Sequence, residues 1–202
     1  HELRRDLAAE SPLVRQMAGL IGELDALEAA HRLAREIDAH LPVLAPPGRM
    51  RLVGARHPLL DPRLARRRER VLAARGHESA VEPLDIELTP ERRALVITGP
   101  NAGGKTVALK TLGLLALAAQ AGLPIPAAAT SEMPHLTSLV ATVGDEQDLL
   151  ADRSTFSGRL ARLAEAYRAA GPQSLALLDE LGSGTDPEEG TALAVALLET
   201  LV

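Results

Sequence analysis

Residues 99–106 have the composition and spacing of a loop that binds phosphate. The segment reads glycine, four residues, then glycine, lysine and threonine, and it comprises Gly99, Pro100, Asn101, Ala102, Gly103, Gly104, Lys105 and Thr106. Glycines let a backbone curl around a phosphate and present N–H groups with no Cβ in the way. The Lys105 ammonium can reach the β- and γ-phosphates of a nucleotide, and the Thr106 hydroxyl can ligate Mg²⁺. The segment therefore predicts binding of ATP and Mg²⁺.

Two carboxylates follow an apolar run further along the chain. Residues 175–178 are apolar and lead directly into Asp179 and Glu180. Any strand can end in acidic residues, but this position after a phosphate loop is typical of nucleotide hydrolases. In those enzymes the first carboxylate holds Mg²⁺ and the second polarises the attacking water. We therefore predict that Asp179 binds the metal and that Glu180 is the general base.

The use of charged and aromatic residues narrows the function further. Of 22 basic residues in 202, only Lys105 and Lys110 are lysine. A lysine in the phosphate loop fits a site that uses a compact ammonium group, whereas we expect a surface or packing role for Lys110.

The chain has no cysteine, which excludes disulfides, thiol nucleophiles and cysteine-ligated metals. Phe156 and Tyr167 are the only aromatic residues and the net charge is −5, so a nucleic-acid surface built on base stacking or general basicity is not expected here.

Helices and strands are expected to alternate around these motifs. Residues 1–41 predict a helix with Ser11 as N-cap and Pro12 at its first position. We interpret residues 1–45 as a helical segment, either packed on a neighbour or the end of a long lever, and residues 46–202 as a second domain. Strands are predicted at 50–54, 94–98, 139–143 and 174–178, and helices at 105–121 and 154–170. Continuous apolar runs such as 94–98 are typical of buried parallel strands, so we expect an α/β domain with a mainly parallel sheet.

The chain contains no membrane or export signal. No apolar run approaches the roughly 18–20 residues that span a bilayer, and no signal peptide opens the sequence. We therefore expect a cytoplasmic protein with no membrane partner. The chain begins at His1 and ends at Val202 within a helical pattern, which we interpret as a piece of a larger protein.

Several motifs together resemble the ATPase domain of the MutS family. Glycine-proline-asparagine at 99–101 is similar to the start of the MutS phosphate loop, and residues 178–185 resemble its acidic strand and the loop after it. Residues 154–158 resemble the MutS signature segment, and residues 56–58 match a short arginine-histidine-proline motif. Residues 144–147 and 184–190 are similar to the bacterial paralogue that suppresses recombination, the MutS-two branch.

This resemblance implies a fold and an assembly. The fold would be a phosphate-loop NTPase of the ABC-ATPase type with a mainly parallel sheet, preceded by the helical lever segment. The ATPase domains would form a homodimer with ATP at each interface, and Gln147 would sense the γ-phosphate. A signature segment would reach the γ-phosphate held by the opposite subunit, and it comprises Ser154, Thr155, Phe156, Ser157 and Gly158.

The implied function is ATP hydrolysis to ADP and phosphate by the motor of a DNA-binding protein. Such a protein would act on branched or mismatched DNA in repair and recombination, with DNA contacts and any nuclease step lying outside residues 1–202. The alternative is a nucleotide-gated dimerisation scaffold that acts on ribosomes or nucleic acid with little catalysis. A transporter or chromosome-condensing ATPase would carry leucine-serine-glycine-glycine in its signature, which this chain lacks.

Some residues depart from the family pattern or have no assigned task. The switch histidine expected beyond the acidic strand is absent from the chain, and no aromatic residue precedes residues 94–98 to stack on adenine. Val81 or His57 could take that place by position. The arginine-rich residues 66–70 predict a solvated surface, with contact to nucleic-acid phosphates as the alternative. Structural or surface roles are expected for the other histidines weighed, which are His31, His40, His77 and His135.

Overall fold

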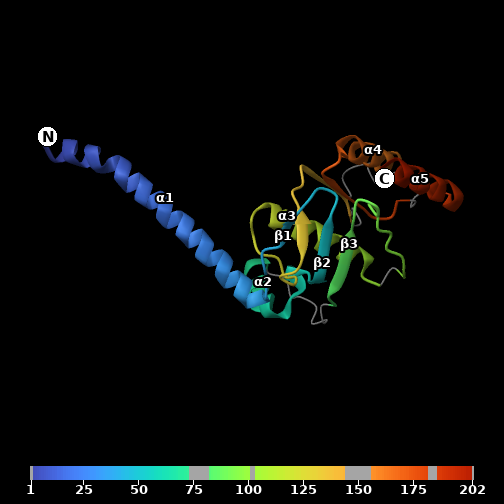
Figure 1. Cartoon of the computed structure of the whole chain (residues 1–202), viewed down its shortest axis with the longest axis horizontal. Helices are drawn as coiled ribbons and strands as arrows, with labels where there is room; N and C mark the ends of the chain where they lie inside the picture. Colours follow the sequence, from blue (N-terminus) through green and yellow to red (C-terminus); the bar gives the residue numbers. More distant parts are fainter. Residues whose placement is uncertain (1, 73–81, 101–102, 144–155, 182–185, 202) are drawn as a thin grey trace.

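The computed structural model describes residues 2–72, 82–100, 103–143, 156–181 and 186–201 (Figure 1). Helices and strands follow one another along the chain in an α/β arrangement. The elements are α1 (Glu2–Ile37), β1 (Val43–Ala45), β2 (Met50–Ala55), the short 3-10 helices η1 (Pro58–Leu60) and η2 (Pro62–Leu64), α2 (Ala65–Leu72), β3 (Leu84–Leu88), α3 (Lys105–Gln120), β4 (Glu132–Pro134), β5 (Ser138–Thr142), α4 (Phe156–Ala169), β6 (Ser174–Leu178) and α5 (Pro187–Leu201).

Helix α1 is an arm that leaves the rest of the molecule and carries the N-terminal end of the chain far from it (Figure 1). The helix predicted over residues 1–41 is present from Glu2 to Ile37, but the N-cap at Ser11 is wrong, because Pro12 lies inside the helix rather than at its first position. The residues before Pro12 include leucine, arginine, alanine and glutamate, all strong helix formers, so the helical conformation extends past the proline. The helix ends where Asp38 adopts a left-handed conformation with φ of 52°.

A four-stranded sheet lies on one side of α3 and has the order β1-β4-β2-β3. Strand β1 pairs with β4 in parallel, whereas β2 pairs with both β3 and β4 in antiparallel fashion. Leu52 from β2 and Ile86 from β3 are buried in the core with Leu115 of α3. This sheet therefore covers one side of the helix that follows the phosphate loop.

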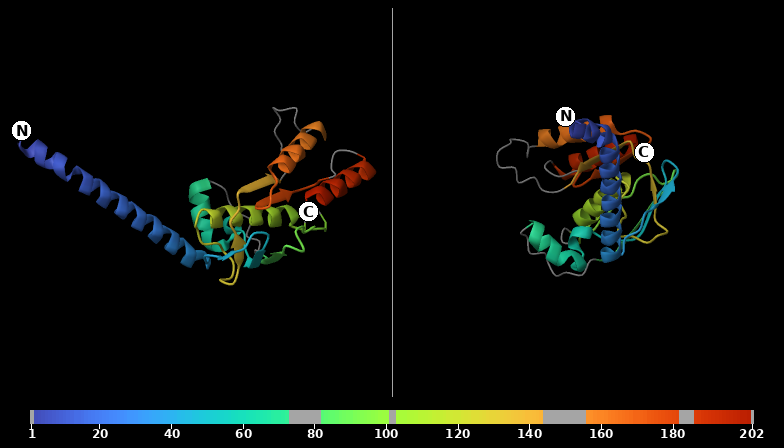
Figure 2. Two further views of the ribbon diagram at one scale, coloured as in Figure 1. Left: turned by 45° about the horizontal axis from the view of Figure 1, so that its top comes forward. Right: turned by 90° about the vertical axis from the view of Figure 1, so that its left-hand side faces the viewer.

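A second sheet contains β5 and β6, which pair in parallel from Ser138 and Ser174 to Thr142 and Leu178. Its buried residues belong to the same apolar cluster as α3, and Figure 2 shows α3 running between the two sheets. An ideal Cβ built on Gly113 of α3 would lie 2.8 Å from Cδ1 of Leu177 in β6. This close approach of helix and strand fixes where the start of α3 lies relative to the carboxyl end of β6.

The prediction of a mainly parallel sheet of the ABC-ATPase type is wrong. The larger sheet is mixed, and β2, its best paired strand, is antiparallel to both neighbours. Residues 94–98, expected as a buried parallel strand, are not a strand, and Leu95, Val96 and Ile97 are exposed. An apolar run becomes a buried strand only if strands lie on both sides of it, and in the described ranges none pairs with residues 94–98. By contrast, β6 and α3 lie where the sequence predicted them.

Among the helices in the described part of the chain, none is both long enough and apolar enough to span a membrane.

Candidate functional site

The phosphate-loop motif forms a turn that leads into the first residue of α3. Gly104 is the N-cap of α3 and has a φ of 79°, a left-handed conformation that glycine adopts without steric cost. The backbone N–H of Gly103 donates to the carbonyl of Pro100 at 2.9 Å. An ideal Cβ on Gly103 would lie 3.0 Å from that same oxygen. Glycine is therefore favoured at both positions by the shape of the turn, while Asn101 and Ala102 lie outside the described residues.

The two polar side chains after the turn point to different partners. The ammonium of Lys105 donates a hydrogen bond back to the carbonyl of Gly99, across the loop. The hydroxyl of Thr106 donates to Oδ2 of Asp179 at 2.8 Å. The second bond joins the start of α3 to the residue that follows β6. It brings together the two residues that the sequence assigned to Mg²⁺.

The acidic pair lies at the carboxyl edge of the β5–β6 sheet. The backbone N–H of Asp179 donates to the carbonyl of Thr142 at 2.9 Å, which extends the pairing of the two strands by one residue. Glu180 follows in a left-handed conformation with φ of 50°, which is costly for a residue with a side chain, and strained residues of this kind cluster at active sites. Asp179 and Glu180 therefore lie at the same edge as the start of α3.

Sequence reasoning did not single out Thr142, whose backbone carbonyl accepts the hydrogen bond from Asp179. Its hydroxyl oxygen is buried and, among the described residues, has no hydrogen-bond partner. It is the last residue of β5 and is paired with Leu178, directly before the acidic pair. The prediction of parallel strands ending at 143 and 178 could have identified it, because the ends of adjacent parallel strands meet at one edge.

A cavity of about 1180 Å³ opens beside the loop and the acidic pair. Lys105, Thr106, Asp179 and Glu180 line its polar part. Leu95, Val96 and Ile97 line an apolar part together with Leu175 and Leu177 of β6. A large, mainly apolar cavity with a few convergent charged groups is the usual form of a small-molecule site.

The other predicted site residues are only partly described. Phe156, Ser157 and Gly158 form the first turn of α4, which packs on β5. Ser154, Thr155, Gln147 and Val81 lie outside the described residues. The signature segment and the sensor residue therefore remain predictions.

His57 does not line the cavity. Burial and the nearby charge of Lys110 together hold the pKa of its imidazole below the usual value of 6.5. Its Nδ1 atom is buried and has no hydrogen-bond partner in the part of the chain that the structure describes. Because Lys110 is on α3, His57 lies beside the helix that carries Lys105, and its assignment to adenine stays a prediction.

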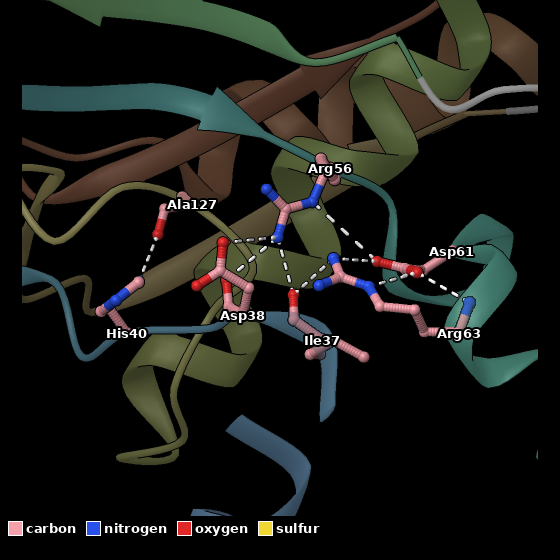
Figure 3. A network of polar contacts seen from close by, with 7 residues as sticks. All are labelled: Ile37, Asp38, His40, Arg56, Asp61, Arg63 and Ala127. Atoms are coloured by element: carbon pink, nitrogen blue, oxygen red, sulfur yellow. Dashed lines mark hydrogen bonds and ion pairs between the residues drawn. The ribbon is translucent and has the colours of Figure 1, made fainter. Parts of the chain in front are cut away.

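A second polar cluster joins the end of α1 to the body (Figure 3). The carbonyl of Ile37 accepts hydrogen bonds from the guanidinium groups of Arg56 at 2.6 Å and Arg63 at 2.9 Å. Asp61, only 2% exposed, accepts two side-chain bonds from Arg63 at 3.0 and 2.8 Å. Since positive charge is favourable at a helix C-terminus, this cluster holds the end of α1 in place.

Burial and hydrogen bonding act in opposite directions on Asp61. Burial alone would raise the pKa of its carboxyl, but the hydrogen bonds from Arg63 and the charges of Arg63 and Arg56 outweigh it, so the pKa lies below 3.8. The same hydrogen bond raises the pKa of Arg63. The sequence motif included Arg56, but nothing in the polar segment after it indicated which residues would pair.

The donor set near the loop fits a magnesium ion. Among the residues described, no group of three or more His, Asp or Glu side chains is arranged to hold a metal. Mg²⁺ is commonly bound by one or two protein oxygens, with water and substrate phosphates as the remaining ligands. The Thr106 hydroxyl and the Asp179 carboxylate, 2.8 Å apart, meet that requirement.

Comparison with known proteins relates the chain to one family. Residues 95–202 match the family model described as MutS domain V. The chain is 42% identical over 200 residues to Endonuclease MutS2 of Enterococcus faecalis, covering 99% of the chain and 23% of that protein. Proteins with the same description from Pelotomaculum thermopropionicum and Thermomicrobium roseum are 44% and 46% identical; 99% and 89% of the chain align with 24% and 22% of those proteins. The chain thus spans less than a quarter of the length of these curated relatives.

Proposed function

The chain belongs to the MutS family, and from this premise we propose that it binds ATP and Mg²⁺ at residues 99–106 and hydrolyses the nucleotide with Asp179 and Glu180. The observation that carries the proposal is the hydrogen bond of 2.8 Å between Thr106 and Asp179. A phosphate-loop threonine and a carboxylate from a neighbouring strand are the protein groups that hold Mg²⁺ in nucleotide hydrolases. The ion would neutralise phosphate charge when bound.

Each residue at the edge has a distinct task in the proposed reaction. The N–H groups at the start of α3 and the Lys105 ammonium bind the phosphates and stabilise the charge that develops on the transferred group. A water oxygen forms a bond to the γ-phosphorus while the bond from that phosphorus to the bridging oxygen of ADP breaks. Glu180 accepts the proton that the water gives up. Thr106 and Asp179 orient each other through their hydrogen bond.

The proposed reaction takes place between two copies of the chain. The signature segment, residues 154–158, would approach the γ-phosphate held by the opposite copy, and Gln147 would sense that phosphate. Turnover would then close and open the dimer and thereby control DNA binding by other parts of a longer protein, in recombination or repair. This proposal is separate from the nuclease named in the description of the relatives, which are more than four times as long as their matched segments.

Phosphate release and nucleotide binding by the chain test the proposal. Lys105→Ala should weaken MgATP binding at least tenfold, whereas Lys110→Ala, the same change five residues further along α3, should leave it unaltered. Specific activity should rise with protein concentration if two copies form the site. Equal MgATP binding by the wild type and Lys105→Ala would refute the assigned site. Binding without phosphate release would support the alternative of a nucleotide-gated scaffold.

A further inference from the structure

The guanidinium of Arg56, at the end of α1, makes only some of the hydrogen bonds that it could make (Figure 3). Its Nη2 atom donates to the carbonyls of Ile37 at 2.6 Å and Asp38 at 3.0 Å. Its Nε atom is buried and, among the residues that the structure describes, has no hydrogen-bond partner. A buried donor without a partner has lost its bonds to water and gained none in return, which is unfavourable. The present arrangement therefore leaves one donor of Arg56 unused.

An acceptor that would suit Nε lies close by. Oδ2 of Asp61 is 3.9 Å from Nε of Arg56, which is close enough for an ion pair but too far for a hydrogen bond. That oxygen accepts one side-chain bond, from Nη2 of Arg63 at 2.8 Å, and a carboxylate oxygen can accept two. A movement of the guanidinium by about 1 Å would bring Nε within hydrogen-bond range of Asp61.

Forming this bond would displace the end of α1. Because Nη2 of Arg56 binds the last carbonyls of the helix, the guanidinium must either release the Asp38 carbonyl or take the helix end with it. Asp38 has a φ of 52°, an unfavourable conformation for a residue with a side chain. His40 is fixed to the body, since its backbone exchanges two hydrogen bonds of 2.9 Å with Ile125. A rotation of α1 would therefore take place at Asp38 and Ala39.

We propose that α1 has two positions on the body and that Arg56 changes partner between them. In the first position, which is the one described above, Arg56 binds the Asp38 carbonyl. In the second, Nε of Arg56 binds Asp61, the Asp38 carbonyl is released, and the helix turns about residues 38–39. One hydrogen bond from a charged donor replaces another, so the two positions are close in free energy. The second should then hold roughly 5–10% of the molecules.

The distance between two spin labels measures the direction of the arm. The chain has no cysteine, so labels can be attached through Glu23→Cys on α1 and Arg51→Cys on β2. Both residues are exposed. Double electron–electron resonance then gives the distribution of distances between the labels.

Three variants of the labelled chain separate the two positions. Arg63→Met removes the side chain that competes for Asp61, whereas Arg56→Lys removes the Nε–H group that the second position requires. Arg66→Met is the control, because Arg66 is exposed on α2 and has no polar partner among the described residues. Circular dichroism checks that each variant is folded.

The expected result is a pair of distances whose proportions follow the partners of Arg56. Arg63→Met should raise the second distance to at least about a third of the molecules, a roughly tenfold change in the ratio of the two. Arg56→Lys should show the first distance alone, and Arg66→Met should match the wild type.

Two outcomes would overturn the proposal. One is the same single distance in the wild type and Arg63→Met, since a bound water would then satisfy Nε. The other is a broad distribution that no variant changes, since α1 would then have no discrete positions. If Arg63→Met does not fold, Arg56→Lys decides the matter: a second distance that persists without Nε–H contradicts the proposal, and its loss supports it.

Discussion

The hydroxyl of Thr106 donates a hydrogen bond of 2.8 Å to the carboxylate of Asp179, although 73 residues separate them in the chain. The bond depends on two elements meeting at their ends: α3 begins at Lys105, and β6 ends at Leu178. Because Gly113 allows α3 to approach Leu177 closely, these two ends lie side by side. The contact between helix and strand therefore places the two oxygens together.

The first prediction concerns this pair of oxygens. Thr106→Val removes the hydroxyl but keeps the shape of the side chain, so MgATP binding should weaken by a factor of about 10 through loss of one oxygen ligand and one hydrogen bond. Thr106→Ser retains the hydroxyl and should bind as the wild type does. Titration with a fluorescent ATP analogue, with and without Mg²⁺, measures the effect. An effect of Thr106→Val that persists without Mg²⁺ would argue against a role for this hydroxyl at the metal.

A second prediction separates binding from chemistry. Glu180→Gln keeps the size of the side chain but cannot accept the proton from water, so phosphate release should fall by about 10²–10⁴-fold. ATP binding should stay within a factor of about two, because the phosphates are held by the loop. Glu69→Gln, the same change on the exposed surface of α2, serves as the control for phosphate release. Unaltered turnover in Glu180→Gln would show that another group is the base.

A third prediction tests the approach of α3 to β6. Gly113→Leu would place a side chain where the Cβ alone already lies 2.8 Å from Leu177, and overpacking of this kind costs about 1–3 kcal/mol of the free energy of unfolding. Gly22→Leu makes the same change on the exposed arm, where leucine is the better helix former, and should leave stability equal or slightly higher. Urea unfolding followed by circular dichroism compares the two. If both variants are equally stable, the contact does not set the position of α3.

A fourth prediction concerns the pH dependence of stability. Because the pKa of Asp61 is lower in the folded protein than its usual 3.8, its contribution is complete above about pH 4 and is lost as the pH falls through the folded value. Asp61→Asn should lower the free energy of unfolding near pH 7 by about 1.5–3 kcal/mol, the worth of hydrogen bonds to a charged group. It should also flatten the fall in stability below pH 4. Urea unfolding at several pH values measures this.

The control for the fourth prediction is an acidic residue in an exposed ion pair. Glu87→Gln breaks the exposed pair with Arg92, which should change stability by less than about 0.5 kcal/mol. If Asp61→Asn changes the free energy of unfolding as little as this control does, and its stability falls below pH 4 as that of the wild type does, the cluster at the end of α1 does not stabilise the fold.

Local signals in the sequence predicted the parts of the site that depend on local chemistry. The phosphate-loop motif at residues 99–106 contains the glycines that a phosphate loop needs, and a helical pattern follows it in the sequence. The other signal is the apolar run of β6, with acidic residues directly after it. Residues 94–98 have an equally apolar pattern, yet a pattern of that kind carries no information about which strands will lie beside it. The short β1 and β4 were not predicted either, because three-residue strands are stabilised by pairing rather than by their own composition.

The polar contacts between distant segments were the least predictable. Asp61 and Arg63 lie in an arginine-rich stretch whose composition suggests only a solvated surface. What distinguishes Asp61 is that it is buried beneath the end of α1, and burial depends on the packing of that helix. The same holds for Thr142, whose neighbours are fixed by the register of β5 against β6.

The attachment of α1 at a single end has a mechanical consequence. At 1.5 Å per residue, its 36 residues span about 54 Å. A rotation of only about 5° at Ile37 would therefore displace the far end by roughly 5 Å, close to the pitch of one helical turn. The hydrogen bonds from Arg56 and Arg63 to the Ile37 carbonyl therefore set the direction of the whole helix, and with it the position of the residues at its far end.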